Sequence, residues 1–589
     1  MFASYARQAR KALPPVGRII AGGIPHGGIN ARDALAAMPP TDAIELVNVL
    51  SNPYGMGIRN GYQEFAINLP GAAEVKTVMS FYPGTVNPPV TPGPVSGSMS
   101  LIQVQAPRAA VPTVNGQIFA CTNGQVYDIS AGGTGPWSAL LAAAVTTDYW
   151  NYINFQNDIS NFLCACNEDG GYYVYGGSGF SSGFSSGFAI DSTVFNKIQA
   201  GSTPGKISGI NPDLFTYCVS WKRRLWFIEK NSTRAWYLPV QQITGAASMF
   251  DFGVNFRHGG SLAVLVSWTV DGGEGLDDYL VAISTQGDVV IYKGTDPNDA
   301  TTFALHGIWY VGALPRGKRC VDPVGGDIYI LSVAGLSQIS KLIAMGQIAA
   351  ELTEDIGDKL DPLIRAYMQT SVNKDGWFVK MIPHEQMLVV GVPPQVANAG
   401  AIHLALKIRQ NAWSKMMELP ITHYTNHDSL VFGGGNLQST IIPAGGKVML
   451  MFDNSLDYET LSDTVEGTLI KCRIVPAYQT FGTPAMIKRF TMVRPTFIAQ
   501  YNPSGHIILI TDYGQLAAWE MPVTPVQSGD VWDQALWDQA YWSGLNQPVH
   551  KWVGVHGAGF AATAQIDFIG AGGTLVTAID YATIEGGPL

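Results

Sequence analysis

Four carboxylates crowd the short stretch VDGGEGLDDY, which holds Asp271, Glu274, Asp277 and Asp278. Clustered oxygen ligands are the ones that calcium prefers. Their spacing is not that of a helix-loop-helix calcium site, and acidic glycine-rich turns also join ordinary β-strands. Paired carboxylates are the groups that glycosidases use, but nothing in this spacing sets two of them across a cleft. We therefore expect a turn between strands, with a bound metal ion as the alternative.

Two histidines, His423 and His427, stand four positions apart in HYTNHD, next to Asp428. On a helix this spacing would suit a zinc ion. The Tyr, Thr and Asn between them favour a strand, where residues four apart lie too far from each other to share one ion. No P-loop, G-x-S-x-G or H-E-x-x-H pattern is present in the sequence. The sequence therefore predicts no catalytic residue, no cofactor and no metal site among these patterns.

Cysteines and short basic clusters are the remaining residues that could take part in chemistry or binding. Of the six cysteines, at 121, 164, 166, 218, 320 and 472, only Cys164 and Cys166 are close in sequence. No second pair completes a zinc site or a disulfide framework, so we expect free structural thiols and folding in a reducing cytoplasm. The basic clusters 222–224 and 316–319 are interpreted as charges that cap turns or bridge subunits rather than bind nucleic acid.

The elements that must position these residues are short β-hairpins. AISTQGDVVIYKGTDP, residues 282–297, has apolar residues on both sides of a Gln-Gly-Asp turn. Related hairpins begin at 118, 162, 225, 279, 327, 387 and 430, a mean spacing of about 52 residues. Repeated hairpins at such a period are typical of β-propellers, because one blade cannot cover both of its own faces. We expect a mainly β fold with a propeller of about six blades and a few short helices.

Four regions are expected along the chain. Residues 1–20 form an N-terminal arm, and residues 21–110 form a platform segment rich in Gly and Pro. The propeller covers 111–455, with a helical insertion near 342–369, where apolar residues recur at helical spacing and Pro362 starts a second helix. Residues 456–589 return to strands and form a C-terminal β platform.

Two sets of residues are candidate partner contacts. GFSSGFSSGF is a loop of Gly and Ser that spaces three aromatic residues evenly: Phe180, Phe184 and Phe188. Exposed aromatic residues mark interaction sites; the alternative is a loop that folds back onto its own domain. The arm supplies three cations: Arg7, Arg10 and Lys11. It is interpreted as a short amphipathic helix or a flexible basic segment.

The overall composition narrows the class of protein. The formal net charge of −10 argues against a protein that binds nucleic acid by neutralising phosphates. No apolar run is long enough for a transmembrane helix, and the N-terminus lacks the apolar core of a secretory signal. A chain of 589 residues with 47% hydrophobic residues is globular and should hold several domains.

Several stretches, in this order, resemble one family. The opening GGINARDALAAMPPTDAIELVNVLSNPYGMGIRNGY, residues 27–62, has a Gly-rich start, an Arg-Asp, a Met-Pro-Pro and an Arg-x-Gly-Tyr. The middle stretches are WKRRLWFIEKNSTRAWYLPV, GGSLAVLVSWTVDGGEGLDDYLVAISTQGDVVIYKGTDP and PRGKRC, and WDQALWDQAYW follows late in the chain. From about residue 20 to about 545 the chain resembles the nozzle proteins of short-tailed bacteriophages, also called tail tubular protein B.

The resemblance implies a structural virion protein that is not an enzyme and has no catalytic residues. It implies a β-propeller with a platform from both chain ends, residues 456–589 being the nozzle domain. Copies of the chain would form a homohexameric ring below the tail adaptor protein, beside tail fibre or needle proteins, and double-stranded DNA would pass through the lumen without specific binding. The protein would belong to the tail of the virion and be assembled in the cytoplasm of the host bacterium. From the net charge we expect an acidic lumen, which repels the duplex.

Two other readings of the sequence stay open. A β-propeller of a phage or bacterium could instead serve host recognition, as a glycan-binding adhesin or as an enzyme that degrades host surface polysaccharide. The third reading is a cytoplasmic scaffold propeller unrelated to any virus.

Overall fold

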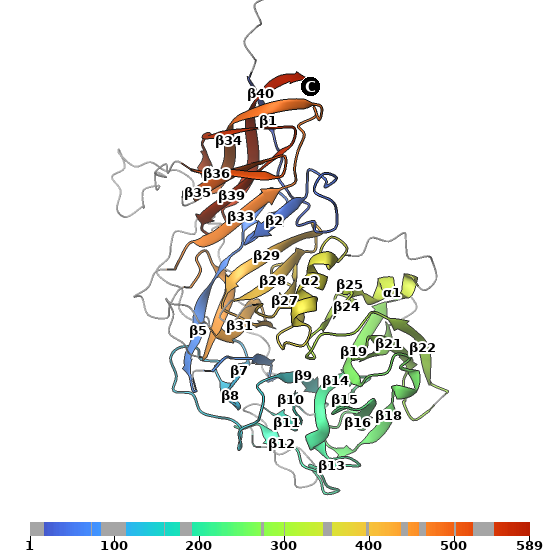
Figure 1. Cartoon of the computed structure of the whole chain (residues 1–589). Helices are drawn as coiled ribbons and strands as arrows, with labels where there is room; N and C mark the ends of the chain where they lie inside the picture. The colour runs from blue at the N-terminus through green and yellow to red at the C-terminus, as the bar shows by residue number, and fades with distance from the viewer. Residues whose placement is uncertain are drawn as a thin grey trace, which may run out of the picture. The chain divides into compact units, whose positions relative to one another are not determined.

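The chain folds mainly into β-strands, as its repeated hairpins predict (Figure 1). The computed structural model describes residues 17–588 except 72, 84–113, 158–159, 177–190, 192, 272–275, 300, 346–355, 396–399, 437–445, 459–466, 500–501 and 522–546. The chain divides into two compact units. Unit 1 combines Met1–Arg59 with Leu469–Leu589, and unit 2 is Asn60–Thr468.

Unit 2 contains seven consecutive sets of antiparallel strands, called sheets 1 to 7 here. In six of them the strands pair in chain order, each with the next, as expected of hairpins joined by tight turns. Sheet 1 has β6 (Thr77–Phe81), β7 (Gln117–Thr122) and β8 (Gln125–Asp128). Sheet 2 has β9 (Trp150–Gln156), β10 (Asn161–Asn167), β11 (Tyr172–Tyr175) and β12 (Asn196–Lys197). Sheet 3 has β14 (Phe215–Trp221), β15 (Arg224–Glu229), β16 (Arg234–Tyr237) and β18 (Ser248–Asp251). Sheet 4 has β19 (Leu262–Asp271), β20 (Leu276–Ser284), β21 (Asp288–Gly294) and β22 (Phe303–Tyr310). Sheet 5 has β23 (Val321–Val324), β24 (Asp327–Ser332) and β25 (Gly335–Gln338).

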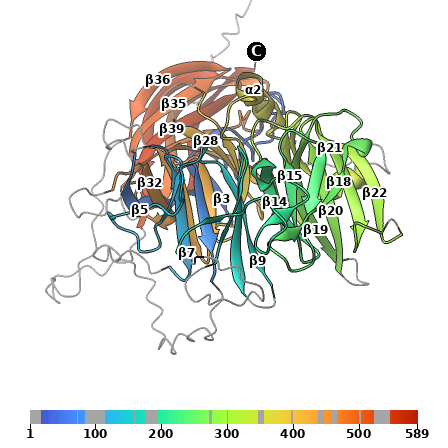
Figure 2. The ribbon, with the colours of Figure 1, turned by 90° about the horizontal axis from the view of Figure 1, so that it is seen from below.

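Sheet 7 is the exception, because its outer strand comes from the beginning of the unit. Sheet 6 has β26 (Phe378–Ile382), β27 (Met387–Val392), β28 (Ala401–Lys407) and β29 (Ala412–Leu419). Sheet 7 has β30 (His423–His427), β31 (Leu430–Asn436), β32 (Gly446–Asn454) and β5 (Gly61–Leu69). Figure 2 shows the blue β5 beside the orange β32, with which it pairs antiparallel. The two ends of unit 2 are thereby held in one sheet.

The sheets contact one another in a closed cycle through their first strands. β6, β9, β14, β19, β23, β26 and β30 each lie against the following sheet, and sheet 7 returns to contact β6. Apolar residues of facing sheets form a shared core at four of these junctions: sheets 1 and 2, 2 and 3, 3 and 4, and 7 and 1. Because each sheet has neighbours on both faces, residues on both faces are apolar, which explains why β27 is fully buried and β10 is buried except at Asn161.

Short elements connect the sheets of unit 2. Two helices follow sheet 5, α1 (Ile339–Met345) and α2 (Asp361–Ser371), and Pro362 stands in the first turn of α2, where its missing N–H is not needed. A parallel pair joins β13 (Ile207–Ser208) to β17 (Gly245–Ala246). Two single turns of 3-10 helix are Pro212–Leu214 and Gly253–Asn255.

Unit 1 is built jointly by the two ends of the chain. Its longest strands, β34 (Met486–Ala499) and β40 (Leu575–Pro588), pair with each other, and β40 also pairs with β1 (Gly17–Ala21). The other strands around them are β3 (Val49–Asn52), β4 (Gly55–Ile58), β37 (Gln547–His550) and β38 (Val553–Gly559). Next to one another in this order lie β2 (Ala43–Val47), β33 (Ile470–Pro476), β39 (Ala562–Gly570), β35 (Ser504–Thr511) and β36 (Gly514–Glu520).

Three expectations can be compared with this fold. The mainly β class is confirmed, whereas the count of about six blades is not: the described residues hold seven consecutive sheets, and no single sheet among them closes on itself. The boundary between the two compact units falls between residues 59 and 60, so β5 and β6 both belong to unit 2. All six cysteines are buried and free, as the lack of paired spacing predicted.

Candidate functional site

Polar contacts tie each of the seven sheets to the next, most of them between first strands. Buried His423 on β30 accepts a 2.8 Å hydrogen bond from the backbone N–H of Val78 on β6, and the Thr425 hydroxyl donates to the carbonyl oxygen of the same residue at 2.7 Å. Further contacts of 2.8 to 3.0 Å follow around the cycle: Asn154 to Ser80, Cys218 to Asn151, Lys222 to Asp278, Trp268 to Gly326, Met381 to Asp322 and Asn426 to Met381. Every pair of neighbouring sheets is therefore joined by at least one polar contact.

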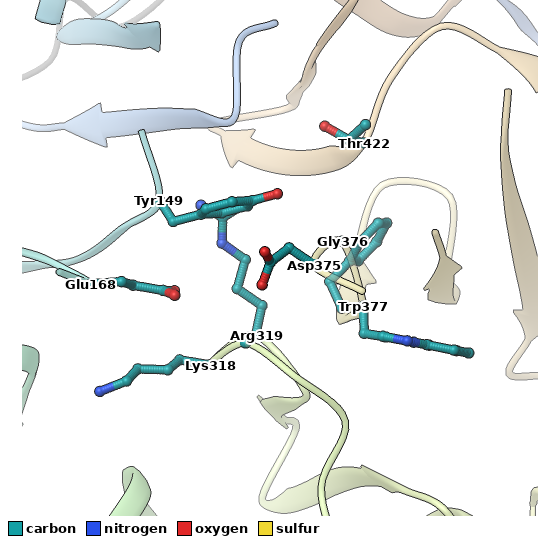
Figure 3. Close-up of a pocket in the computed structure, with 10 residues that line it drawn as sticks. Tyr149, Glu168, Lys318, Arg319, Asp375, Gly376, Trp377 and Thr422 are labelled. Carbon is teal, nitrogen blue, oxygen red and sulfur yellow. The ribbon is translucent and has the colours of Figure 1, made fainter. Parts of the chain in front are cut away.

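A pocket with about 350 Å³ of open space lies where several of these first strands begin. Its lining residues come from the segments just before β9, β23, β26 and β30 and just after β10. They are Tyr149, Glu168, Gly317, Lys318, Arg319, Asp375, Gly376, Trp377, Phe378 and Thr422 (Figure 3). Four of the seven sheets contribute, so the pocket belongs to the centre of the cycle.

Arg319 is the residue that crosses this centre. It precedes β23 of sheet 5, yet its guanidinium donates a 2.7 Å hydrogen bond to the carbonyl oxygen of Lys76 and another bond to the Thr77 hydroxyl, both at the start of sheet 1. The guanidinium also lies over the Tyr149 ring, 5.2 Å from its centroid. Sheets 1 and 5 are not neighbours in the cycle, so this side chain bridges the space between them.

Glu168 and Lys318 form the titratable part of the pocket. Lys318 donates a hydrogen bond to the Thr216 hydroxyl of sheet 3, and burial lowers its pKa to about 8 even though the Glu168 carboxylate favours its charge. Burial raises the pKa of Glu168, an effect that Arg319 and Lys318 partly offset. A raised carboxyl pKa and a lowered amine pKa are the shifts that general acid and general base catalysis use.

A second carboxylate, Asp375, enters the same space. Figure 3 shows Glu168 and Asp375 approaching from opposite sides of Arg319. Asp375 is paired with the exposed Arg316 at 2.8 Å. The pocket thus combines two carboxylates, two cations and the aromatic ring of Tyr149.

The partner contacts named from the sequence lie outside the described residues. This holds for Phe180, Phe184 and Phe188 and for Arg7, Arg10 and Lys11. In the acidic stretch VDGGEGLDDY, residues 272–275 also lie outside the described residues. Asp278 of the same stretch pairs with Lys222 at 2.8 Å and accepts a hydrogen bond from the Thr269 hydroxyl. In the part of the chain that the structure describes, no group of three or more His, Cys, Asp or Glu could hold a metal ion.

The two histidines have structural roles on β30. His427 accepts at Nδ1 from the Ser80 hydroxyl at 2.7 Å, since its Nε2 lies 2.9 Å from the Asn115 carbonyl oxygen and must donate to it. His423 and His427 therefore both bind the neighbouring sheet 1. The prediction of a strand at this position, rather than a helical metal site, is confirmed.

Sequence reasoning missed the pocket, although one signal was present. The cluster 316–319 was interpreted as turn-capping or subunit-bridging charge, and the structure turns Lys318 and Arg319 toward the centre of the cycle instead. Glu168 and Asp375 stand in ordinary turn sequences, NEDGG and NKDGW, which gave no signal. Only the closure of the cycle brings these positions together.

Comparisons with known proteins identify no family for the chain. No family model and no curated protein matches the sequence. Among solved structures, two of an exo-β-1,3-galactanase from Phanerochaete chrysosporium are similar. The first has 10% sequence identity and a TM-score of 0.23, and the match covers 67% of this chain and 99% of the galactanase chain. The second has 8% sequence identity and a TM-score of 0.22, and the match covers 73% of this chain and 95% of the galactanase chain. A Bacteroides uniformis protein assigned as a 6-phosphogluconolactonase is similar at 10% identity and a TM-score of 0.28, covering 54% of this chain and 83% of that one.

One expectation is corrected by these neighbours. The sequence predicted a protein that is not an enzyme, and the similarity to two galactanase structures contradicts that prediction. Because the TM-scores are low, no residue of those proteins is transferred to this chain.

Among the helices of the described residues, none has the length and apolarity required to cross a membrane.

Proposed function

We propose that the chain is a tail nozzle protein of a short-tailed bacteriophage, built around a seven-bladed β-propeller. The observation that carries the proposal is the composition of unit 1: both chain ends pair with each other there, through β1 with β40 and β2 with β33. A platform made from the two chain ends, outside a propeller made from the middle, is the arrangement that the sequence resemblance implies. In this reading sheets 1 to 7 are the blades.

The closed cycle supports the propeller part of the proposal. In propellers the first and last blades must be joined, and here β5, from the start of unit 2, completes sheet 7. Shared apolar cores between neighbouring sheets and polar contacts between first strands would make such a cycle rigid. A rigid cycle suits a part of a tail that must keep its bore while DNA passes.

The bridge by Arg319 supports a channel between copies rather than inside one. Arg319 joins sheets 1 and 5 across the centre of the cycle, and Lys318 joins sheets 5 and 3. A duplex is about 20 Å wide, far wider than a space spanned by one side chain. In the proposal, six copies surround the channel below the adaptor, beside fibre or needle proteins, in the virion tail. Their combined charge, six times −10, favours a lumen that repels DNA.

The proposal is tested by assembly with the adaptor. The chain, alone and with the tail adaptor protein, is measured by light scattering and imaged by electron microscopy. The expected result is a six-fold ring of this chain on the adaptor, with a lumen lined mainly by acidic and neutral side chains. A chain that stays monomeric with its adaptor would contradict the proposal, and a lumen lined mainly by Lys and Arg would contradict its electrostatic part.

A glycan-degrading enzyme is the second candidate, favoured by the pair of carboxylates in the central pocket. Glu168 has a raised pKa, as a general acid requires, and Asp375 lines the same pocket. Hydrolysis of host polysaccharide by the purified chain, abolished in both Glu168→Gln and Asp375→Asn, would establish this candidate. Hydrolysis unchanged in both variants, or absent from the wild type, would reject the pocket as an active site.

A further inference from the structure

Sheet 4 carries a row of aromatic side chains on one face. The rings of Trp268, Tyr279, His306 and Trp309, called the aromatic row here, follow one another with centroid distances of 5.3, 5.2 and 6.2 Å. The strands explain the alignment: Trp268 on β19 lies opposite Tyr279 on β20. A register shift between β21 and β22 inserts His306, whose ring thereby reaches Tyr279.

The aromatic row lies on the side of sheet 4 that faces away from sheet 3. The other side holds Tyr292 and Phe303, which are packed into the core shared with sheet 3. Trp268 instead donates a 2.9 Å hydrogen bond to the Gly326 carbonyl oxygen of sheet 5. The row therefore begins at the contact with sheet 5 and runs outward along sheet 4, whose strands Figure 2 shows in the order β19 to β22.

The outer part of the row is accessible because sheet 5 is short. Sheet 5 has three described strands, and after β25 the chain continues into α1 rather than into a fourth strand. Trp268 at the inner end is buried and Tyr279 is half-buried, while on the outer strand β22 His306 is exposed and Trp309 is half-buried. The accessible part of the row thus begins at Tyr279.

The position of the Trp309 ring is built into the strand. A Cβ atom added to Gly307 would lie 2.2 Å from the Trp309 indole, so the ring lies directly over the glycine. Only glycine permits this contact, so the indole is held against the sheet. The amine of Lys293 lies over the Tyr279 ring, 5.7 Å from its centroid, and places a hydrogen-bond donor at the row.

We propose that the aromatic row binds a glycan, with a pyranose ring stacked on Trp309 and hydroxyl groups bonded by His306 and Lys293. Sugar rings present C–H groups on their faces and hydroxyls at their rims, so they need flat aromatic surfaces flanked by polar groups. A single-stranded nucleic acid would need several cations along its backbone, whereas Lys293 is the one cation placed at the row by the described contacts. A protein partner would need a broader apolar patch than one row of half-buried rings.

The test uses tryptophan fluorescence and calorimetry on the full-length chain. The probes are three trisaccharides, β-1,3-galactotriose, maltotriose and N-acetylchitotriose, with an oligothymidine as the competing ligand class. Trp309→Ala removes the ring, and Gly307→Ala displaces it while leaving the ring present. Leu305→Ala is the matched control, because Leu305 lies on the same strand with 43% exposure and is paired with Tyr292 on the opposite side.

The expected result is saturable binding of at least one trisaccharide that Trp309→Ala and Gly307→Ala weaken about tenfold or more and Leu305→Ala leaves unchanged. Circular dichroism of each variant checks that the fold is retained. Binding of no trisaccharide, equal binding by Trp309→Ala, or tighter binding of oligothymidine than of every sugar would each overturn the proposal. None of these results depends on whether the chain forms a nozzle.

Discussion

The guanidinium of Arg319 and the carbonyl oxygen of Lys76 are joined by a 2.7 Å hydrogen bond between two sheets that are not neighbours. The residues are 243 positions apart in the chain. The bond joins sheets 1 and 5 directly across the centre of the cycle. The contacts between neighbouring first strands connect the same two sheets only through the sheets that lie between them. Arg319 therefore holds together the pocket as well as the cycle.

Removing this bridge should destabilise unit 2. In Arg319→Ala, the Lys76 carbonyl oxygen and the Thr77 hydroxyl lose their charged donor, and the free energy of unfolding should fall by about 2 kcal/mol. The control is Arg316→Ala, three positions earlier, because Arg316 is 65% exposed and its ion pair with Asp375 should contribute less than about 1 kcal/mol. Urea denaturation compares the two. Equal losses in both variants would contradict a bridging role for Arg319.

The sequence predicted the repeating unit better than the number of repeats. The seven hairpin positions 118, 162, 225, 279, 327, 387 and 430 fall on or beside the second strand of sheets 1 to 7, β7, β10, β15, β20, β24, β27 and β31. These strands are apolar on both faces and therefore visible in the sequence. First strands such as β23, with the sequence VDPV, contain buried polar groups that are satisfied only by the neighbouring sheet. A first strand such as β23 therefore lacks the alternation of apolar and polar residues that predicts a strand. About six blades were inferred where the described residues form seven sheets.

The site was not predictable because it depends on long-range closure. β5 pairs with β32 although the buried pair Glu64 and Lys447 on these strands is separated by 383 positions. Glu168, Lys318 and Asp375 likewise come from turns of three different sheets. Local patterns of hydrophobicity specify strands and turns, but they do not specify which turns share one end of a closed cycle.

Acid should weaken the contact between sheets 7 and 1. Burial lowers the pKa of His423 well below its usual value, with Arg319 as a further cause, and burial also lowers the pKa of His427. Both rings stay neutral in the fold, whereas the unfolded chain takes up protons below about pH 6.5, so stability is lost as the pH falls below that value. The expected loss is up to about 1.4 kcal/mol per histidine and pH unit.

Urea denaturation at pH 7 and pH 5 measures this loss. In His423→Asn, the side-chain oxygen can still accept from Val78 but cannot titrate, and the difference between the two pH values should shrink. His26→Asn, at an exposed position, should leave the difference unchanged. A wild-type protein equally stable at both pH values would show that the buried histidines are not coupled to folding.

The buried pair on the closing strand should be sensitive to loss of one partner. Lys447 donates to Glu64 at 2.7 Å and to the Tyr458 hydroxyl at 3.2 Å, and the two charged side chains are 9% and 3% exposed. Lys447→Met leaves the Glu64 carboxylate buried without its cation and should cost about 3 kcal/mol. Lys447→Met with Glu64→Leu should recover part of that loss, because no charge is then left unpaired. Thermal unfolding of the single and double variants checks both statements, and a double variant less stable than Lys447→Met would contradict them.

The amine of Lys318 should react with acylating reagents at lower pH than the other lysines. Burial lowers its pKa to about 8, so about half of the amine is neutral and nucleophilic at pH 8, while ordinary lysines titrate near pH 10.4. Competitive acetylation followed by mass spectrometry gives the titration midpoint of each lysine. Glu168→Gln removes the carboxylate that favours the charged amine, so the midpoint of Lys318 should fall further, whereas Asp213→Asn, which alters the exposed pair with Lys197, should leave it unchanged. A midpoint for Lys318 near the ordinary value, or one that rises in Glu168→Gln, would mean that the two groups do not share the pocket in solution.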